Sequence, residues 1–125
     1  MRPISIELTN FGSHASTTIY FADLGSAAVL MGPTGSGKST ILDAILYAHT
    51  GKCRADLDSQ IRRGETDMGI KYVFETRGEI YQIIRKRSKR GKNASTMAEI
   101  FKATGNPLDP WGEPLKPAKE TIERL

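Results

Sequence analysis

Cysteine is almost absent from this chain, because Cys53 is the only one among 125 residues. A single cysteine excludes an internal disulfide and fits a reducing compartment. Long apolar runs are also absent, since no segment approaches the roughly 20 residues that a membrane-spanning helix needs. The first residues alternate polar with apolar side chains, so they lack the continuous apolar stretch of a secretory signal peptide. We therefore expect a cytoplasmic protein without membrane contact.

Aromatic residues are few, at 7%, whereas charged residues make up 26% of the chain. This composition is typical of a soluble globular protein rather than of a disordered one. A chain of this length can build one domain with a modest core, and it is too short for two.

Positive charge is concentrated in one short segment. Six basic residues and no acid fall between positions 85 and 92, whereas the rest of the chain carries 12 basic against 14 acidic residues. Such a run predicts a loop or strand end that meets an anion, and a solvated loop is the alternative. If the segment contacts DNA phosphates, the candidate residues are Arg85, Lys86, Arg87, Lys89, Arg90 and Lys92.

Apolar periodicity predicts three strands and a helix in the first half of the chain. Alternation over residues 4–9 and a short run over 17–21 predict two strands. The continuous apolar run over 27–31 predicts a strand buried on both faces, as in a parallel sheet. Residues 41–48 follow helical spacing, and Gly51 is placed to end that helix.

The second half of the chain predicts an antiparallel meander. Alternating residues on both sides of Arg77 and Gly78 predict a hairpin, followed by a basic loop and a third strand over 95–103. Four of the six prolines lie in 105–117 and predict a loop, and residues 118–125 predict the start of a helix. We expect a single lobe over 1–125, with a P-loop unit over 1–51, the meander over about 66–104, and the loop and an unfinished helix over 105–125.

The segment GPTGSGKS, residues 32–39, matches the P-loop pattern G-x-x-x-x-G-K-[ST] at every fixed position. Its glycines allow successive backbone N–H groups to point at phosphates, and the following helix N-terminus adds donors. Lys38 is expected to reach the β and γ phosphates as the catalytic residue, and the Ser39 hydroxyl is expected to ligate Mg²⁺. The candidate nucleotide-binding residues are Gly32, Pro33, Thr34, Gly35, Ser36, Gly37, Lys38, Ser39 and Thr40.

Three classes of P-loop protein can be compared with this pattern. Two strands precede the P-loop and a meander follows it, which is the order of an ABC-type ATPase head. A small P-loop nucleoside or metabolite kinase would instead need parallel strands after the P-loop. A DNA-binding fragment with a vestigial P-loop would not need to keep Lys38 and Ser39. The guanine-reading tetrapeptide N-K-x-D of GTPases does not occur.

Several segments together resemble the N-terminal half of SbcC, a family of SMC-like, ABC-class DNA-repair ATPases. They are the ELTNF segment with the S-H that follows it, MGPTGSGKSTILDAI, IRRG, and a hairpin that ends in Y-x-I-x-R. The resemblance implies an α/β P-loop NTPase fold. In this fold, a mixed sheet with an antiparallel meander surrounds one P-loop helix and forms the N-terminal lobe of an ABC/SMC head. It also implies a role in the SbcCD exonuclease complex, in ATP-dependent processing of double-strand breaks and hairpin ends.

The resemblance further implies cofactors, partners and additional site residues. The cofactors are ATP and Mg²⁺, and the cell compartment is the cytoplasm, at the nucleoid. The partners are the C-terminal half of the same head, an SbcD-type nuclease, double-stranded DNA, and a second head that pairs head-to-head when ATP binds. Ser13, Arg62 and Arg63 lie where relatives approach the nucleotide, although a turn residue and a solvated pair are the alternatives. Gly12 replaces an arginine that some members use for nucleotide or DNA, so that contact is not expected here.

The family's other catalytic motifs are missing from this sequence. No LSGG signature, Walker B aspartate or catalytic glutamate pattern occurs. In the family these come from the C-terminal half of the head, after a long coiled coil. Phosphoryl transfer to water needs a base and a positioned water besides the phosphate cradle. We therefore expect a truncated lobe that binds ATP weakly and hydrolyses it negligibly by itself.

Overall fold

The computed structural model describes residues 1–21, 38–53 and 56–125, with only the backbone of Lys38 and Ser39. The predicted strand over 27–31 lies outside these ranges. The elements are, in chain order, β1 (Arg2–Phe11), β2 (His14–Tyr20), α3 (Lys38–Thr50), the 3-10 helix η1 (Leu57–Gln60), β3 (Asp67–Thr76), β4 (Glu79–Arg90), β5 (Asn93–Lys102) and α4 (Ala118–Arg124).

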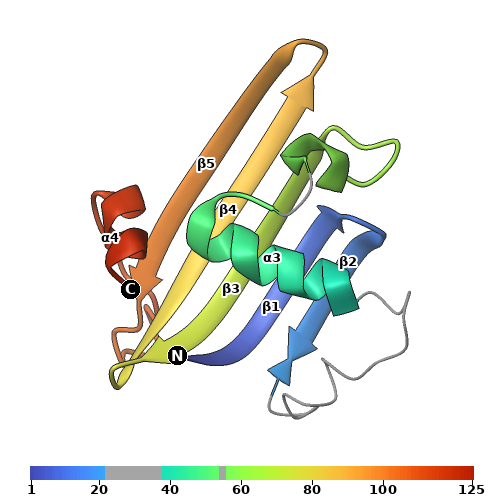
Figure 1. The fold of residues 1–125 in the computed structure, drawn as a ribbon. Coiled ribbons are helices and arrows are strands. Elements are labelled where there is room, and N and C mark those ends of the chain that lie inside the picture. Colours follow the sequence, from blue (N-terminus) through green and yellow to red (C-terminus); the bar gives the residue numbers. More distant parts are fainter. Residues whose placement is uncertain (22–37, 54–55) are drawn as a thin grey trace.

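The five strands form one sheet in the order β2-β1-β3-β4-β5, and every neighbouring pair is antiparallel (Figure 1). The hairpin β1–β2 is joined to the meander β3–β4–β5 through the pairing of β1 with β3. Both the N-terminal strand pair and the meander are thus confirmed. The parallel strand that would make this sheet mixed is the one predicted over 27–31, outside the described residues.

The turn between β3 and β4 is formed by Arg77 and Gly78, as predicted. Both residues have positive φ angles, 53° and 79°. This is the signature of a type I′ turn, whose twist matches that of the two strands it joins. The turn fixes the register of the hairpin, in which Tyr72 lies opposite Ile83 and Ile70 lies opposite Arg85.

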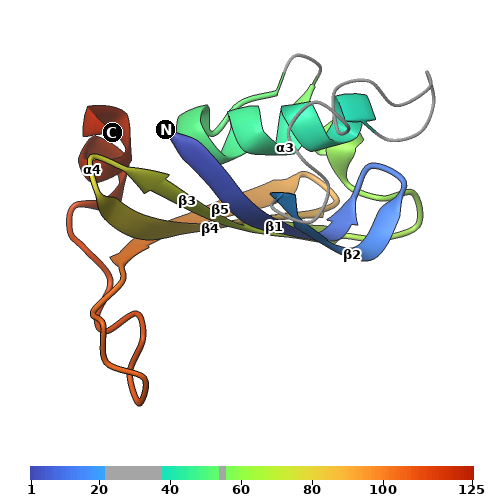
Figure 2. The ribbon, with the colours of Figure 1, turned by 90° about the horizontal axis from the view of Figure 1, so that it is seen from below.

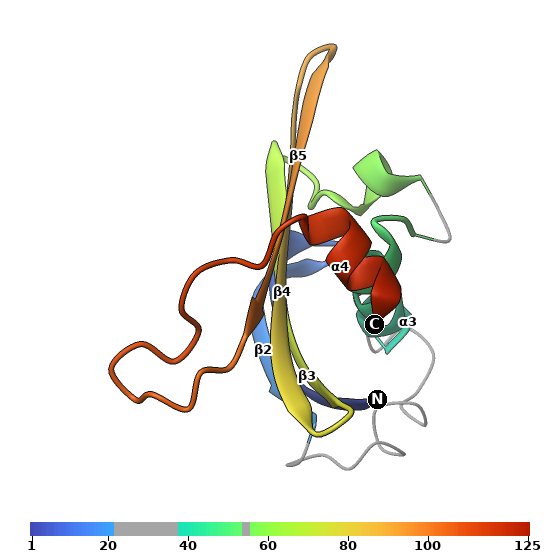
Figure 3. The same ribbon diagram turned by 90° about the vertical axis from the view of Figure 1, so that its left-hand side faces the viewer.

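The core lies between one face of the sheet and α3 (Figure 2). Alternate residues of β1 and β3, including Ile6, Leu8, Tyr72 and Phe74, are fully buried on this face. Ala44 of α3 is also fully buried, which lets the helix lie close to the strands. α4 lies on the same side of the sheet, and the loop between β5 and α4 projects from the other side (Figure 3). None of the helices in the described ranges is long and apolar enough to cross a membrane.

The basic segment is mostly strand, so the prediction of a basic loop after the hairpin was wrong. Positions 85 to 90 belong to β4, and the turn to β5 lies at positions 91 and 92. Strand pairing sends neighbouring side chains to opposite faces, which separates the like charges. Arg85, Arg87 and Lys89 lie on the α3 side, in phase with buried Ile83. Figure 1 shows this β4–β5 hairpin reaching beyond the ends of the other strands.

Candidate functional site

The first turn of α3 is the described part of the predicted P-loop. Gly32, Pro33, Thr34, Gly35, Ser36 and Gly37 lie outside the described residues. Lys38 and Ser39 begin α3, where their backbone N–H groups belong to the end that lacks intrahelical acceptors. That helix end also carries partial positive charge, so it favours a phosphate. The predicted roles of the two side chains stay predictions.

The turn between β1 and β2 packs against this first turn of α3. Gly12 has a φ angle of 60°, and a Cβ built there would lie 2.8 Å from Thr40 Cγ2. Any side chain at position 12 would therefore force Thr40 to shift. Sequence reasoning gave Gly12 no role, although a glycine inside a turn signal was a hint of close backbone approach. The contact places exposed Ser13, the next residue, near the start of the helix.

A third segment, at positions 60 to 63, is tied to the same β-turn. The Gly12 N–H donates to the Gln60 carbonyl at 2.6 Å, and the Arg62 N–H donates to the Asn10 carbonyl at 2.8 Å. An isolated antiparallel bridge also joins Phe11 to Ile61. Arg62 is half-buried and Arg63 is exposed. Their segment, the β1–β2 turn and the start of α3 are thus brought together from three distant parts of the sequence.

Arg85 anchors the far end of α3. Its Nε donates to the Ala48 carbonyl at 2.8 Å, and its guanidinium lies 5.9 Å from the centre of the Tyr47 ring. Burial lowers the pKa of this arginine. Gly51 ends the helix with a φ angle of 74°, and a Cβ there would lie 3.1 Å from Arg85 Nη1. Sequence reasoning grouped Arg85 with the DNA candidates. Its phase with buried Ile83 was the signal that it faces inward.

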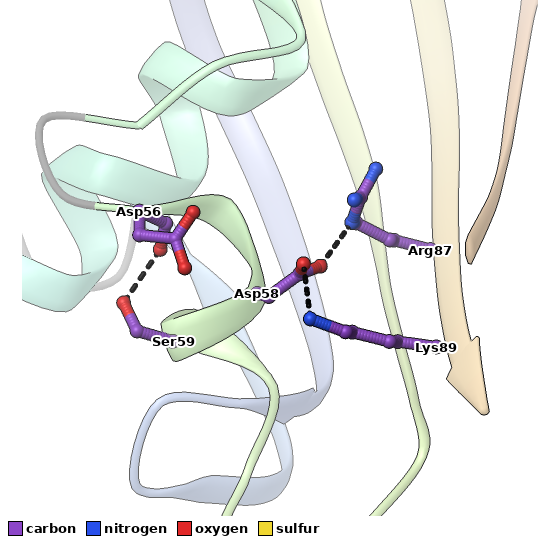
Figure 4. Close-up of polar contacts among 5 residues, drawn as sticks. All are labelled: Asp56, Asp58, Ser59, Arg87 and Lys89. Atoms are coloured by element: carbon purple, nitrogen blue, oxygen red, sulfur yellow. Dashed lines mark hydrogen bonds and ion pairs between the residues drawn. The ribbon is translucent and has the colours of Figure 1, made fainter. Parts of the chain in front are cut away.

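Most of the other basic side chains of the hairpin are paired with acids. Arg87 and Lys89 both contact Asp58 of η1, as Figure 4 shows, and Arg90 lies 3.7 Å from Asp67. The hydrogen bond from Arg87, and then that from Lys89, hold the pKa of the Asp58 carboxyl below its usual range. Within the described ranges, Lys86 and Lys92 have no acidic partner and are exposed. The basic segment is thus a partly neutralised surface.

The most pronounced cavity of the described chain lies elsewhere, on the face of the sheet that is turned away from α3. It measures about 450 Å³ and lies over β1, β3 and β4. Its lining includes Glu7, Gly69, Lys71 and Lys86, and the missing side chain of Gly69 helps to open it. None of the predicted nucleotide-binding residues lines this cavity.

The chain matches the family model described as "AAA domain" over residues 5–123. The "DNA double-strand break repair Rad50 ATPase" of Thermoplasma volcanium is 41% identical over 96 residues, which cover 76% of this chain and 10% of that protein. The SbcC component of the nuclease SbcCD from Deinococcus radiodurans is 38% identical over 118 residues, which cover 90% of this chain and 12% of that protein. The chain thus spans about a tenth of the length of these relatives.

Two solved structures share the fold. One, described as "Structural biochemistry of ATP-driven dimerization and DNA stimulated activation of SMC ATPases", has a TM-score of 0.60 at 19% identity. The match covers 99% of this chain and 76% of that one. The other, "Structure of the recombination mediator protein RecF-ATP in RecFOR pathway", has a TM-score of 0.58 at 16% identity, covering 94% of this chain and 28% of that one. These likenesses establish a P-loop fold of the ABC/SMC N-terminal lobe type.

Proposed function

The chain belongs to the AAA domain family, as the N-terminal part of an SbcC/Rad50-like ATPase head, and from this premise we propose that it binds ATP with Mg²⁺ at the start of α3. One observation carries the proposal: an intact P-loop sequence leads into α3 where two further predicted nucleotide segments pack beside it. The family role is that of a repair ATPase acting on DNA double-strand breaks.

The chemistry of the proposed site begins with the phosphates. Lys38 would supply a positive charge to the β and γ phosphates, and Ser39 would supply a hydroxyl to Mg²⁺. Thr40 is already fixed against Gly12, so the backbone of this first turn is held in place before any ligand arrives. Ser13, Arg62 and Arg63 would then flank the ribose and base. Bound Mg²⁺ would neutralise phosphate charge.

A missing half of the site is proposed to come from the C-terminal half of the same head. The sheet covers one side of α3, whereas Leu42 and Leu46 on its other side are 40% and 38% exposed. Leucines one helical turn apart form an apolar stripe that a second layer could cover. The catalytic base and the signature motif would arrive with that layer. We extend the proposal to a head-to-head dimer in the presence of ATP.

The projecting β4–β5 hairpin is proposed to contact double-stranded DNA. Exposed Lys86 and Lys92, together with Arg87, Lys89 and Arg90, would meet the phosphate backbone. Arg85 drops out of this set because its guanidinium is engaged with α3. The name of the Deinococcus relative supports an SbcD-type nuclease as partner and DNA ends, hairpin ends included, as substrate, at the nucleoid in the cytoplasm.

The test of the proposal is a titration of the chain with Mg·ATP, comparing Lys38→Ala with Lys52→Ala. Lys52 is exposed just beyond the other end of α3, so its removal changes the net charge equally without touching the P-loop. A hydrogen bond to a charged group contributes about 1.5–3 kcal/mol, so Lys38→Ala should weaken binding roughly 10- to 150-fold. Lys52→Ala should bind as the parent does. Equal affinity of the two variants would refute the proposed site.

A further inference from the structure

Asp58 of η1 lies between two cations of the basic hairpin (Figure 4). Its Oδ1 accepts from Arg87 Nε at 2.5 Å, and its Oδ2 lies 3.1 Å from Lys89 Nζ. The Asp58 and Arg87 side chains are only 21% and 19% exposed, so this pair is better shielded than the Arg90–Asp67 pair, at 73% and 54%. One carboxylate thus engages two of the cations proposed to meet DNA.

The geometry of this contact resembles that of a bound phosphate oxyanion. Arginine and lysine bind carboxylate and phosphate through the same charge-assisted hydrogen bonds. Arg87 and Lys89 lie on the same face of β4, two residues apart, and both side chains point toward η1 (Figure 4). An anion that approaches this face of the hairpin must therefore compete with Asp58.

η1 is also linked to the proposed nucleotide site. The Ile61 N–H donates to the Asp58 carbonyl at 3.2 Å, and Ile61 forms the bridge with Phe11. At the end of η1, the Gln60 carbonyl accepts from Gly12, the residue that contacts Thr40. A movement of η1 would therefore act on the backbone that flanks the first turn of α3.

We propose that Asp58 is an internal competitor for DNA: it occupies Arg87 and Lys89 until a backbone phosphate displaces it, and its release loosens η1 and the segment that joins η1 to the β1–β2 turn. This inference rests on the proposed DNA contact of the hairpin. It makes Asp58 the group through which DNA on the hairpin alters the surroundings of the nucleotide site.

The first test is binding of a short DNA duplex to the intact protein at several salt concentrations. Asp58→Asn removes the competing charge and should tighten binding roughly 3- to 30-fold, as expected when two partly exposed ion pairs no longer have to be broken. Asp58→Glu keeps the charge and should stay close to the parent. Asp67→Asn is the matched control, because it removes one negative charge beside the same hairpin but leaves η1 untouched. Equal tightening by Asp67→Asn and Asp58→Asn would overturn the proposal.

The second test follows backbone hydrogen exchange at the amides of Gly12, Ile61 and Arg62. In the parent, duplex DNA should speed exchange at these amides, because η1 is released. In Asp58→Asn their exchange should already be fast without DNA, and DNA should change it little. Asp67→Asn should behave as the parent does. Exchange at these amides that DNA leaves unchanged or slows in the parent would overturn the proposal, even if Asp58→Asn binds more tightly.

A double variant, Arg87→Gln with Lys89→Gln, separates failure of this inference from failure of the DNA contact. If it binds duplex DNA as the parent does, the two cations do not contact DNA, and both the contact at this face and the competition are wrong. If it binds more weakly while Asp58→Asn and the parent bind equally, the DNA contact stands and only the role of Asp58 is refuted. Weakened binding by the double variant with tightened binding by Asp58→Asn supports both.

Discussion

His49, in the last turn of α3, is a titratable side chain enclosed by aromatic rings. Its ring stands edge-on to Tyr72, with centroids 5.4 Å apart, and to Phe74 at 5.1 Å. Its Nε2 is buried, and neither that atom nor the Tyr72 hydroxyl finds a hydrogen-bond partner within the described part of the chain. Burial, and then the nearby charge of Arg85, lower the pKa of His49 below its ordinary value of 6.5.

This lowered pKa predicts that acid weakens the fold. The unfolded chain takes up a proton at His49 near pH 6.5, whereas the folded chain resists it until lower pH, so the free energy of unfolding should fall as pH drops below 6.5. One proton gives a slope of at most about 1.4 kcal/mol per pH unit. Denaturant unfolding at a series of pH values should show this slope in the parent and a flatter profile in His49→Gln. Parallel profiles between pH 6.5 and 5 would show that His49 does not carry the effect.

At the scale of elements, α3 is held at both ends by residues distant in sequence. Gly12 and Thr40 fix its start, and Arg85 caps its end at the Ala48 carbonyl while lying over the Tyr47 ring. Cationic groups at a helix C-terminus also interact favourably with the helix dipole. The helix that would present the P-loop is thus positioned by the hairpin strand β4.

Replacing Arg85 should therefore destabilise the fold. Arg85→Gln removes the charged hydrogen bond to Ala48 and leaves a carbonyl unpaired, which should lower the free energy of unfolding by about 1–3 kcal/mol. Lys86→Gln is the control, since Lys86 neighbours Arg85 in sequence but lies exposed on the opposite face, and its effect should stay within about 0.5 kcal/mol. Unfolding curves that coincide for the two variants would mean that Arg85 is no cap.

The elements themselves were predictable from local pattern, because strand alternation and helix spacing are short-range signals. The hairpin turn at Arg77 and Gly78 and the helix stop at Gly51 follow from backbone freedom at single residues. The basic segment was misread as a loop because like charges masked its period of two. Its long-range partners, Ala48 for Arg85 and Asp58 for Arg87, are set by strand register, which the sequence does not display.

At the scale of the whole molecule, the proposed site is assembled where three distant segments meet. The P-loop motif could be identified from its spacing alone, since each fixed position has its own chemical reason. The approach of Gly12 to Thr40 and the pairing of Arg62 with Asn10 could not be identified in this way. They depend on how the β1–β2 turn and the segment after η1 fold onto the helix. Family resemblance named Ser13, Arg62 and Arg63, and the fold places their segments together.

The most direct test of the nucleotide site is backbone hydrogen exchange of the chain with and without saturating Mg·ATP. The account predicts slower exchange in three separate segments: the first turn of α3 at Thr40 and Ile41, the turn at Gly12 and Ser13, and positions 62 and 63. Exchange around the cavity on the opposite face, at Gly69 and Lys71, should not change. Protection that appears at the cavity instead, or no protection in the three segments at saturating nucleotide, would contradict the account.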